Sequence, residues 1–230
     1  MHAILITMQK LGLSALPVAL SALTSVLIVK VALGVLLEYG NYFPPDFQSD
    51  FLRGREAYFW GGYQWAFYFH LISGPASLLL GTILVSDWFR SRVPMWHRRL
   101  GRFQVANILL LVAPSGLYMS WYADTGAIAG AGLGTLAIAT AACAGLGWRA
   151  AVTRRFAIHR RWMLRTFILL CSAVVIRMIG GLATVLEFDA VWLYPASCWV
   201  SWLLPVLVFE SWQFLEPRKG VSSSPVPKVT

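Results

Sequence analysis

The stretch "AIAGAGLGTLAIATAACAGLGW", residues 127–148, decides the fold class of this chain. It contains no charged side chain, and Arg149 follows it directly. A helix of roughly 20 apolar residues crosses the hydrocarbon core of a bilayer, where the backbone must satisfy its own hydrogen bonds. The stretch therefore predicts a transmembrane helix. Its alanines and glycines let neighbouring helices approach closely, so we expect this helix to be central and tightly packed.

Five further apolar blocks occur in the sequence, and its composition agrees with them. Hydrophobic residues make up 58% of the chain and charged residues 13%, whereas a soluble domain carries about 25% charged residues. The mean hydropathy is +0.64. We predict an all-α, polytopic membrane protein with six transmembrane helices, at about 11–37, 63–85, 103–122, 127–148, 163–186 and 191–211.

The spacing of these blocks divides the chain into three parts. Residues 1–62 are expected to form an N-terminal transmembrane helix and an extracytoplasmic loop, in which the aromatic stretch 39–62 folds as a lid or a short interfacial helix. Residues 63–212 form the helical membrane core. Residues 213–230 are rich in serine and proline and are expected to be a disordered cytoplasmic tail.

The basic residues gather on one side of the predicted membrane. With six spans, fifteen of the 19 lysines and arginines fall before the first helix, after the last, or in the loops after helices two and four. The positive-inside rule then places both termini in the cytoplasm. The formal charge of +9 is accounted for by anionic lipids of the inner leaflet, and we expect no nucleic acid as a partner.

Two of these basic segments contain the same short motif, which we call the echo. "MWHRRLGRF" at 95–103 and "AIHRRWMLR" at 157–165 each place a His-Arg-Arg triplet at the entrance of an apolar run. Helices two and three, and helices four and five, then form two hairpins of the same direction, which makes them a candidate repeat. Either a duplication or convergent selection for basic cytoplasmic loops explains the echo.

The two histidines of this echo are candidate ligands. His97 and His159 have equal depth and the same sequence context, and histidine is the usual axial ligand of haem iron. A shared haem b or transition-metal ion would be held by this pair. The arginines that match the haem propionates would be Arg98, Arg99, Arg160 and Arg161. The alternative is that each histidine lies at headgroup level beside its arginines, without a ligand.

Two further polar residues fall inside the outer halves of spans. His70 lies in helix two and Arg177 in helix five. Because ionisable side chains inside a membrane are costly, we expect both to face the bundle interior as a buried polar site, with Glu38 or Glu187 as candidate partners of the arginine. The alternative is that each is satisfied separately by local carbonyls.

Glu210, near the inner end of helix six, is expected to form a structural salt bridge with a basic residue. The candidate partners are Arg98, Arg99, Arg160 and Arg161. The sequence contains no P-loop, no Gly-x-Ser-x-Gly, no His-Glu-x-x-His and no Cys-x-x-Cys pattern, which argues against hydrolases and ATPases. No catalytic residue is assigned.

Four stretches together resemble a known family of membrane proteins. "HLISGPASLLLG" (70–81), "HRRLGR" (97–102), "HRRWMLRTF" (159–167) and "WVSWLLPVLVFE" (199–210) are similar to the bacterial membrane proteins grouped as domain of unknown function 2306. The resemblance implies an inner-membrane protein but no established activity. It marks His70, His97, Arg99, His159, Trp162, Met163, Arg165, Arg177 and Glu210. Many members are expected to carry an amide residue where this chain has Pro205, so helix six departs from the pattern there.

A looser similarity is to the transmembrane cytochromes b, which bind haem between histidines of paired helices. Three functions compete on the sequence alone. The first is a redox protein in which His97 and His159 hold haem or a metal and the basic end meets a quinone or an anionic donor. The second is an accessory or assembly subunit of a larger, respiratory-type membrane complex. The third is a small-molecule transporter with His70 and Arg177 in its cavity.

Overall fold

The protein is seen in a computed structural model that describes residues 16–215. Within that range it is helical and holds no β-strand, and six helical segments are long and apolar enough to cross a membrane. This confirms the predicted fold class. The candidate spans are Ser21–Asn41, Glu56–Val85, Pro94–Ser120, Ala127–Val152, Phe156–Val185 and Leu193–Leu215. The predicted tail lies largely outside the described residues, although α11 (Leu193–Leu215) extends past position 212.

Two spans begin earlier than the apolar blocks suggested. α6 (Pro94–Asn107) and α9 (Phe156–Leu170) start several residues before 103 and 163, so each His-Arg-Arg triplet lies in a first turn of helix. Hydropathy excludes arginine from an apolar block, yet arginine is a good helix former. Proline at the start of α6 suits the first turn because its missing N–H would have no intrahelical partner there.

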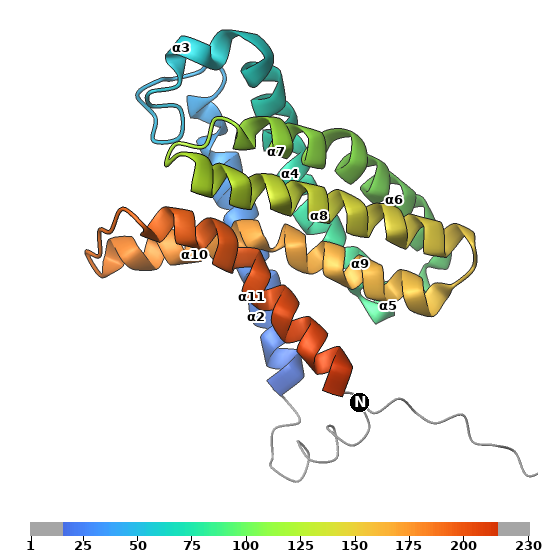
Figure 1. Ribbon diagram of the computed structural model, residues 1–230. Coiled ribbons are helices and arrows are strands. Elements are labelled where there is room, and N and C mark those ends of the chain that lie inside the picture. Colours follow the sequence, from blue (N-terminus) through green and yellow to red (C-terminus); the bar gives the residue numbers. More distant parts are fainter. Residues whose placement is uncertain (1–15, 216–230) are drawn as a thin grey trace, which may run out of the picture.

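The helices run between two chemically different ends of the molecule. Figure 1 shows α5 (Asp87–Arg92), the turn between α8 (Ala127–Val152) and α9, the start of α2 (Leu16–Leu37) and the end of α11 toward the lower right. We call this the basic end. Residues 39–63, which include α3 (Glu56–Tyr58), and the connections that precede α8 and α11 lie toward the upper left. We call this the aromatic end.

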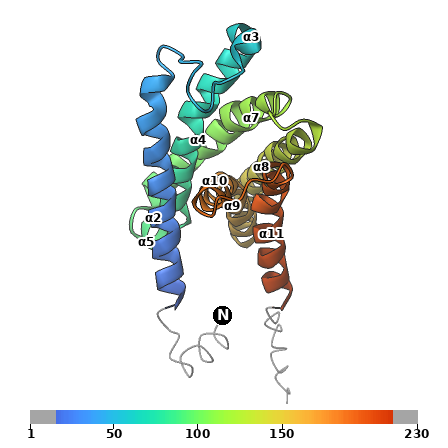
Figure 2. The same cartoon turned by 90° about the vertical axis from the view of Figure 1, so that its left-hand side faces the viewer.

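Helix α8 occupies the middle of the bundle. It packs against α6, α7 (Ala113–Ser120), α9 and α11, while α2 packs on α4 (Gln64–Val85) and α10 (Ser172–Val185). Figure 2 shows α2 and α11 on opposite sides, with α9 and α10 between them. A Cβ at Gly132 would lie 3.0 Å from Trp199 Nε1, and one at Gly147 would lie 2.7 Å from Met163 Sδ. The small residues of α8 therefore let two large side chains approach its backbone.

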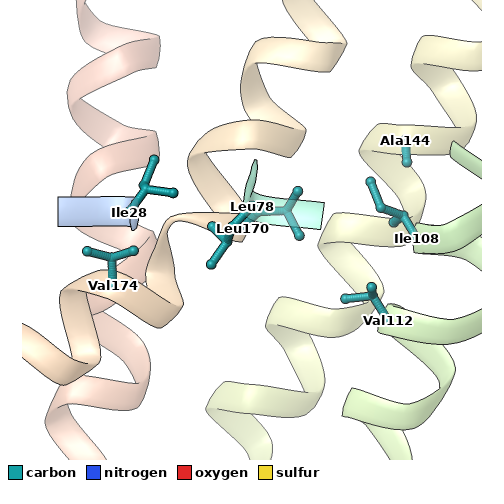
Figure 3. Packing of buried hydrophobic residues seen from close by; sticks show 7 residues of the cluster. All are labelled: Ile28, Leu78, Ile108, Val112, Ala144, Leu170 and Val174. Carbon is teal, nitrogen blue, oxygen red and sulfur yellow. The ribbon is translucent and has the colours of Figure 1, made fainter. Parts of the chain in front are cut away.

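The apolar core is small and is shared by six helical elements. Figure 3 shows Ile28, Leu78, Ile108, Val112, Ala144, Leu170 and Val174, which meet at the centre of the bundle. Many other large apolar side chains face outward, including Leu110, Val185 and Leu207. In a membrane protein such outward faces contact lipid tails, so this exposure is expected for a bilayer-spanning chain.

The aromatic end is a folded cap. Tyr42, Leu52, Phe59, Tyr63, Phe67 and Leu71 form its buried cluster. Arg55 ties the cap together: its Nη1 donates to the Tyr58 hydroxyl at 3.0 Å and to the Tyr122 carbonyl at 3.2 Å. Burial lowers the pKa of Arg55, but the Tyr63 and Tyr58 phenols raise that pKa by more, so the guanidinium stays charged. The loop 39–62 is thus ordered by ring packing around one cation.

Two prolines shape the interior of the bundle. Pro75 leaves the Leu71 carbonyl without its helical donor, and the Tyr39 hydroxyl donates to that carbonyl at 2.8 Å. Pro114 follows a wide turn, η3 (Ile108–Val112), in which the Ala113 N–H donates to the Ile108 carbonyl five residues back. The span that begins with α9 is also interrupted, at Cys171. Both hairpins of the candidate repeat therefore carry a break in their second helix.

Candidate functional site

His159 is fixed at the basic end by a neighbouring helix. Its Nδ1 lies 2.8 Å from the carbonyl oxygen of Gly147 on α8. A carbonyl can only accept a hydrogen bond, so Nδ1 must carry the proton, and in the neutral ring the lone pair is on Nε2. A histidine that ligates a metal commonly donates its other ring N–H to a carbonyl in this way. His159 is thus held in the tautomer that a ligand requires.

His97 lies at the same end on α6. Its Nδ1 is buried and has no hydrogen-bond partner, and its ring centroid lies 6.4 Å from that of Phe89. Its helix packs on α4, α5 and α8, and α9 packs on α4 and α8. The two histidines thus lie on helices that share two neighbours, and among the described residues no hydrogen bond or ring contact joins the two imidazoles.

No larger cluster of metal-binding side chains is present among residues 16–215. In that part of the chain no three histidines, cysteines or carboxylates converge as a set that could hold a metal ion. Any metal bound by the His97 and His159 imidazoles would complete its coordination with ligands of another kind.

The arginines of the two triplets are exposed and have different neighbours. Arg160 Nη2 lies 3.1 Å from both carboxylate oxygens of Asp87, and Arg90 Nη2 lies 3.0 Å from the same carboxylate. Arg99 lies over the Trp96 ring at 5.7 Å from its centroid. Asp87, at the start of α5, therefore links the second triplet to the segment that precedes the first.

Glu210 forms a salt bridge, as expected, but its partner is Arg165. None of the four arginines predicted as partners, which all lie in the described part of the chain, pairs with it. Its carboxylate accepts from Arg165 Nε at 2.5 Å and from Arg165 Nη2 at 2.8 Å. The guanidinium lies over Trp162, 4.7 Å from the ring centroid. Arg165 is six residues after His159, deep enough in α9 to face the inner part of α11, whereas the triplet arginines lie at the helix entrance.

His70 is paired within its own hairpin. Its Nδ1 lies 3.1 Å from Ser115 Oγ, and that hydroxyl donates its single proton to the Leu111 carbonyl at 2.5 Å. The serine oxygen must therefore accept from His70 Nδ1–H, which leaves the lone pair of the neutral ring on Nε2. A Cβ built on Gly74 would meet only this imidazole, at 4.0 Å. A Cβ built on Gly116 would lie 3.2 Å from the ring Cε1, so the imidazole packs closely against α7.

Arg177 has a separate local partner. Its Nη1 donates to the Ala173 carbonyl of its own helix at 3.1 Å, and its charge acts on His70. The side chain is exposed rather than enclosed in the bundle. Glu38, one candidate partner, accepts instead from Asn41 Nδ2 at 2.6 Å. Among the described residues no hydrogen bond joins Arg177 to His70 or to a carboxylate.

A line of buried polar residues, which the sequence analysis did not single out, lies between α4 and α6. Gln104 Nε2 donates to the Ser77 carbonyl at 2.9 Å, and Asn107 Nδ2 donates to Ser77 Oγ at 2.8 Å and to the Ser73 carbonyl at 3.2 Å. The available signal was the pair of amides in an apolar block, since such residues seldom occur in a span without a structural or functional reason.

These features define a polytopic helical membrane protein with its polar groups inside the bundle. Residues 67–213 match the family described as predicted membrane protein (DUF2306), and the chain belongs to that family. No curated protein and no solved structure matches the chain. The similarity to transmembrane cytochromes b therefore gains no support from these comparisons.

Proposed function

We propose that this protein is a redox protein of the bacterial inner membrane that binds haem b or a transition-metal ion through His97 and His159. The observation that carries the proposal is the hydrogen bond from His159 Nδ1 to the Gly147 carbonyl, because it orients the ring and leaves Nε2 free to ligate. The buried, unpaired Nδ1 of His97 supports it. The two histidines would hold the group, and the exposed Arg98, Arg99 and Arg161 would be available to its anionic substituents.

The basic end would then be the place where electrons enter or leave. A bound haem would supply one-electron chemistry, and His97 and His159 would hold it. Exposed guanidinium groups at that end attract an anionic donor at the membrane surface by charge and can donate hydrogen bonds to the carbonyls of a quinone. Anionic lipids of the inner leaflet compete for the same arginines.

The test is a visible absorption spectrum and a metal analysis of the protein purified in detergent. We expect a Soret band that shifts on reduction, or about one transition-metal ion per chain. His159→Asn is the informative variant, because the asparagine amide lies near the Nδ1 position and can still donate to the Gly147 carbonyl but is a poor ligand, so the fold should remain and the cofactor should be lost. His70→Asn is the matched control and should retain the cofactor. A colourless, metal-free wild-type protein from cofactor-replete cells would refute the proposal.

A second candidate function, an accessory subunit of a larger membrane complex, is favoured by one observation. Gly180 and Gly181 of α10 are adjacent, and a Cβ built on Gly181 or on Gly180 would meet nothing within 4 Å. Small residues on an outer face let another helix approach closely. Cross-linking in native membranes followed by purification would then recover a defined partner, and Gly181→Leu would abolish its recovery without unfolding the chain.

A further inference from the structure

Six polar residues form two neighbouring hydrogen-bonded groups in the interior of the first hairpin. We call them together the polar seam, and its members are His70, Ser73 and Ser77 on α4, Gln104 and Asn107 on α6, and Ser115 on α7. From Ser77 to His70 the seam rises seven residues along α4, or about 10 Å. Gln104 extends it toward the basic end, and His70 lies beneath the aromatic cap.

Consecutive members of the seam are in contact along most of its length. Asn107 reaches both Ser73 and Ser77 of the facing helix, Gln104 reaches Ser77, and His70 contacts Ser115. A stretch as polar as this is costly in an apolar bundle, and a leucine at the amide positions would pack without unpaired groups. The free-energy cost of burying these polar side chains indicates a function in addition to helix packing.

Two atoms of the seam are buried without a partner. Gln104 Oε1 and Ser73 Oγ make no hydrogen bond, and both residues are only 2% exposed. Native proteins pair nearly all buried polar atoms with protein or with ordered water. Because both atoms lie among other donors and acceptors, they are suitable partners for internal water molecules, which need two to four polar contacts each.

The wide turn η3 keeps the two halves of the seam on one face. Asn107 and Ser115 are eight residues apart, which at about 100° per residue would turn them about 80° away from each other in an unbroken α-helix. One extra residue in the turn reduces that angle to about 20°. Ser115 thereby faces α4 and meets His70.

We infer that the polar seam is a hydrated proton pathway that ends at His70. A proton arriving through waters at Gln104 and Ser73 binds the lone pair of His70 Nε2, and the imidazolium releases its Nδ1 proton to the Ser115 hydroxyl, which passes its own proton to water. Return of the ring to the Nδ1–H tautomer completes the cycle. One proton enters for each that leaves, in either direction. The pathway uses neither His97 nor His159, so it holds whether or not a cofactor binds.

The test is proton uptake by vesicles of phosphatidylethanolamine and phosphatidylglycerol that contain the purified protein and an internal pH dye. A potassium gradient with valinomycin sets the driving potential and compensates the charge moved. We expect uptake well above that of protein-free vesicles. Asn107→Leu, Gln104→Leu and His70→Phe should reduce uptake toward the protein-free rate. Thr140→Val, which removes a buried hydroxyl outside the seam, should leave it unchanged.

Leakage of an entrapped anionic dye, measured in parallel, separates a proton pathway from a damaged bilayer. If Asn107→Leu does not fold, Ser73→Ala removes one unpartnered hydroxyl with a minimal change in volume and should still slow uptake. Wild-type uptake equal to that of protein-free vesicles would overturn the inference. So would seam variants that fold and retain the full rate, because the seam would then only join helices.

Discussion

At the scale of single residues, the ion pair of Arg165 with Glu210 and the ion pairs at Asp87 differ in their surroundings. The Arg165 side chain is 19% exposed and receives Trp162 on its face, whereas the Asp87 side chain is 63% exposed and is shared by Arg90 and Arg160. Solvent screens an exposed pair almost completely, while a guanidinium enclosed by an aromatic ring depends on its carboxylate. The first pair fixes α11 on α9, and the second adds little stability.

Glu210→Gln is therefore expected to lower the unfolding free energy by about 1–2 kcal/mol, because it leaves the Arg165 guanidinium short of its charged partner. Asp87→Asn, the matched change at the exposed pair, should cost at most about 0.5 kcal/mol. Thermal unfolding in detergent at neutral pH compares the two. Equal shifts in Tm would show that the enclosure of Arg165 has no energetic consequence.

His70 and Arg177 are expected to behave as two independent residues in stability, since each has its own partner. The stability losses of His70→Ala and Arg177→Ala should add to within about 0.5 kcal/mol in the double variant. A double-mutant cycle on Tm in detergent measures this. A coupling clearly larger than that margin would instead point to one shared polar site.

At the scale of helical elements, breaks in the helices position the interior polar groups. Pro75 frees a carbonyl that Tyr39 of the preceding segment occupies, and η3 turns Ser115 toward His70. The prolines are visible in the sequence, but these two structural consequences could not be predicted from it. Neither a wide turn nor a hydrogen bond between residues 32 positions apart produces a periodic pattern in the sequence. The amides of the seam were visible in the sequence, yet their partners depend on helix rotation, which hydropathy does not report.

Deleting Leu110, an exposed residue of η3, should convert the wide turn to ordinary α-helix and leave Ser115 facing His70, because seven residues would then separate it from Asn107 and turn it by only about 20°. In a background without native cysteines, His70→Cys with Ser115→Cys should form a disulfide readily. With Leu110 deleted the same pair should still form it. Loss of cross-linking in a folded deletion variant would show that η3 does not accommodate one extra residue.

The Tyr39 hydroxyl is expected to stabilise the kink of α4 only while the proline is present. Tyr39→Phe should cost about 1 kcal/mol in the natural sequence, as for one lost hydrogen bond. In the Pro75→Ala background the residue-75 N–H can reach the Leu71 carbonyl, so the same change should cost much less. Unfolding in detergent of the four proteins of this cycle decides the matter, and an equal cost in both backgrounds would contradict the assignment.

At the scale of the whole molecule, composition and charge sufficed to predict six spans and the grouping of their ends. Long apolar blocks have a single solution in a bilayer, so the fold class followed from the sequence. The partner of Glu210 did not follow, because eleven arginines occur between residues 90 and 165 and only the packing of α9 on α11 selects Arg165. Function is harder to predict from the sequence than the fold, because the candidate functional residues are few and lie far apart in the sequence.

The basic end and the aromatic end are predicted to lie on opposite sides of the membrane. Single cysteines placed in 90–99 and in 149–161 should be modified by a membrane-impermeant reagent only from the cytoplasmic side. Cysteines in 47–57, within the aromatic cap, should be modified only from the outside. Labelling of intact cells and of inverted vesicles provides the two measurements. Opposite accessibility of the two basic segments would require a different number of spans.

The glycines of α8 restrict how this family can change. A Cβ at position 132 would lie 3.0 Å from the indole nitrogen of Trp199, so the indole would have to shift by a few tenths of an ångström, and one at position 147 would displace the flexible side chain of Met163. The rigid indole yields less readily than the methionine. Correlated substitutions among descendants of a common ancestor should therefore be stronger between positions 132 and 199 than between 147 and 163.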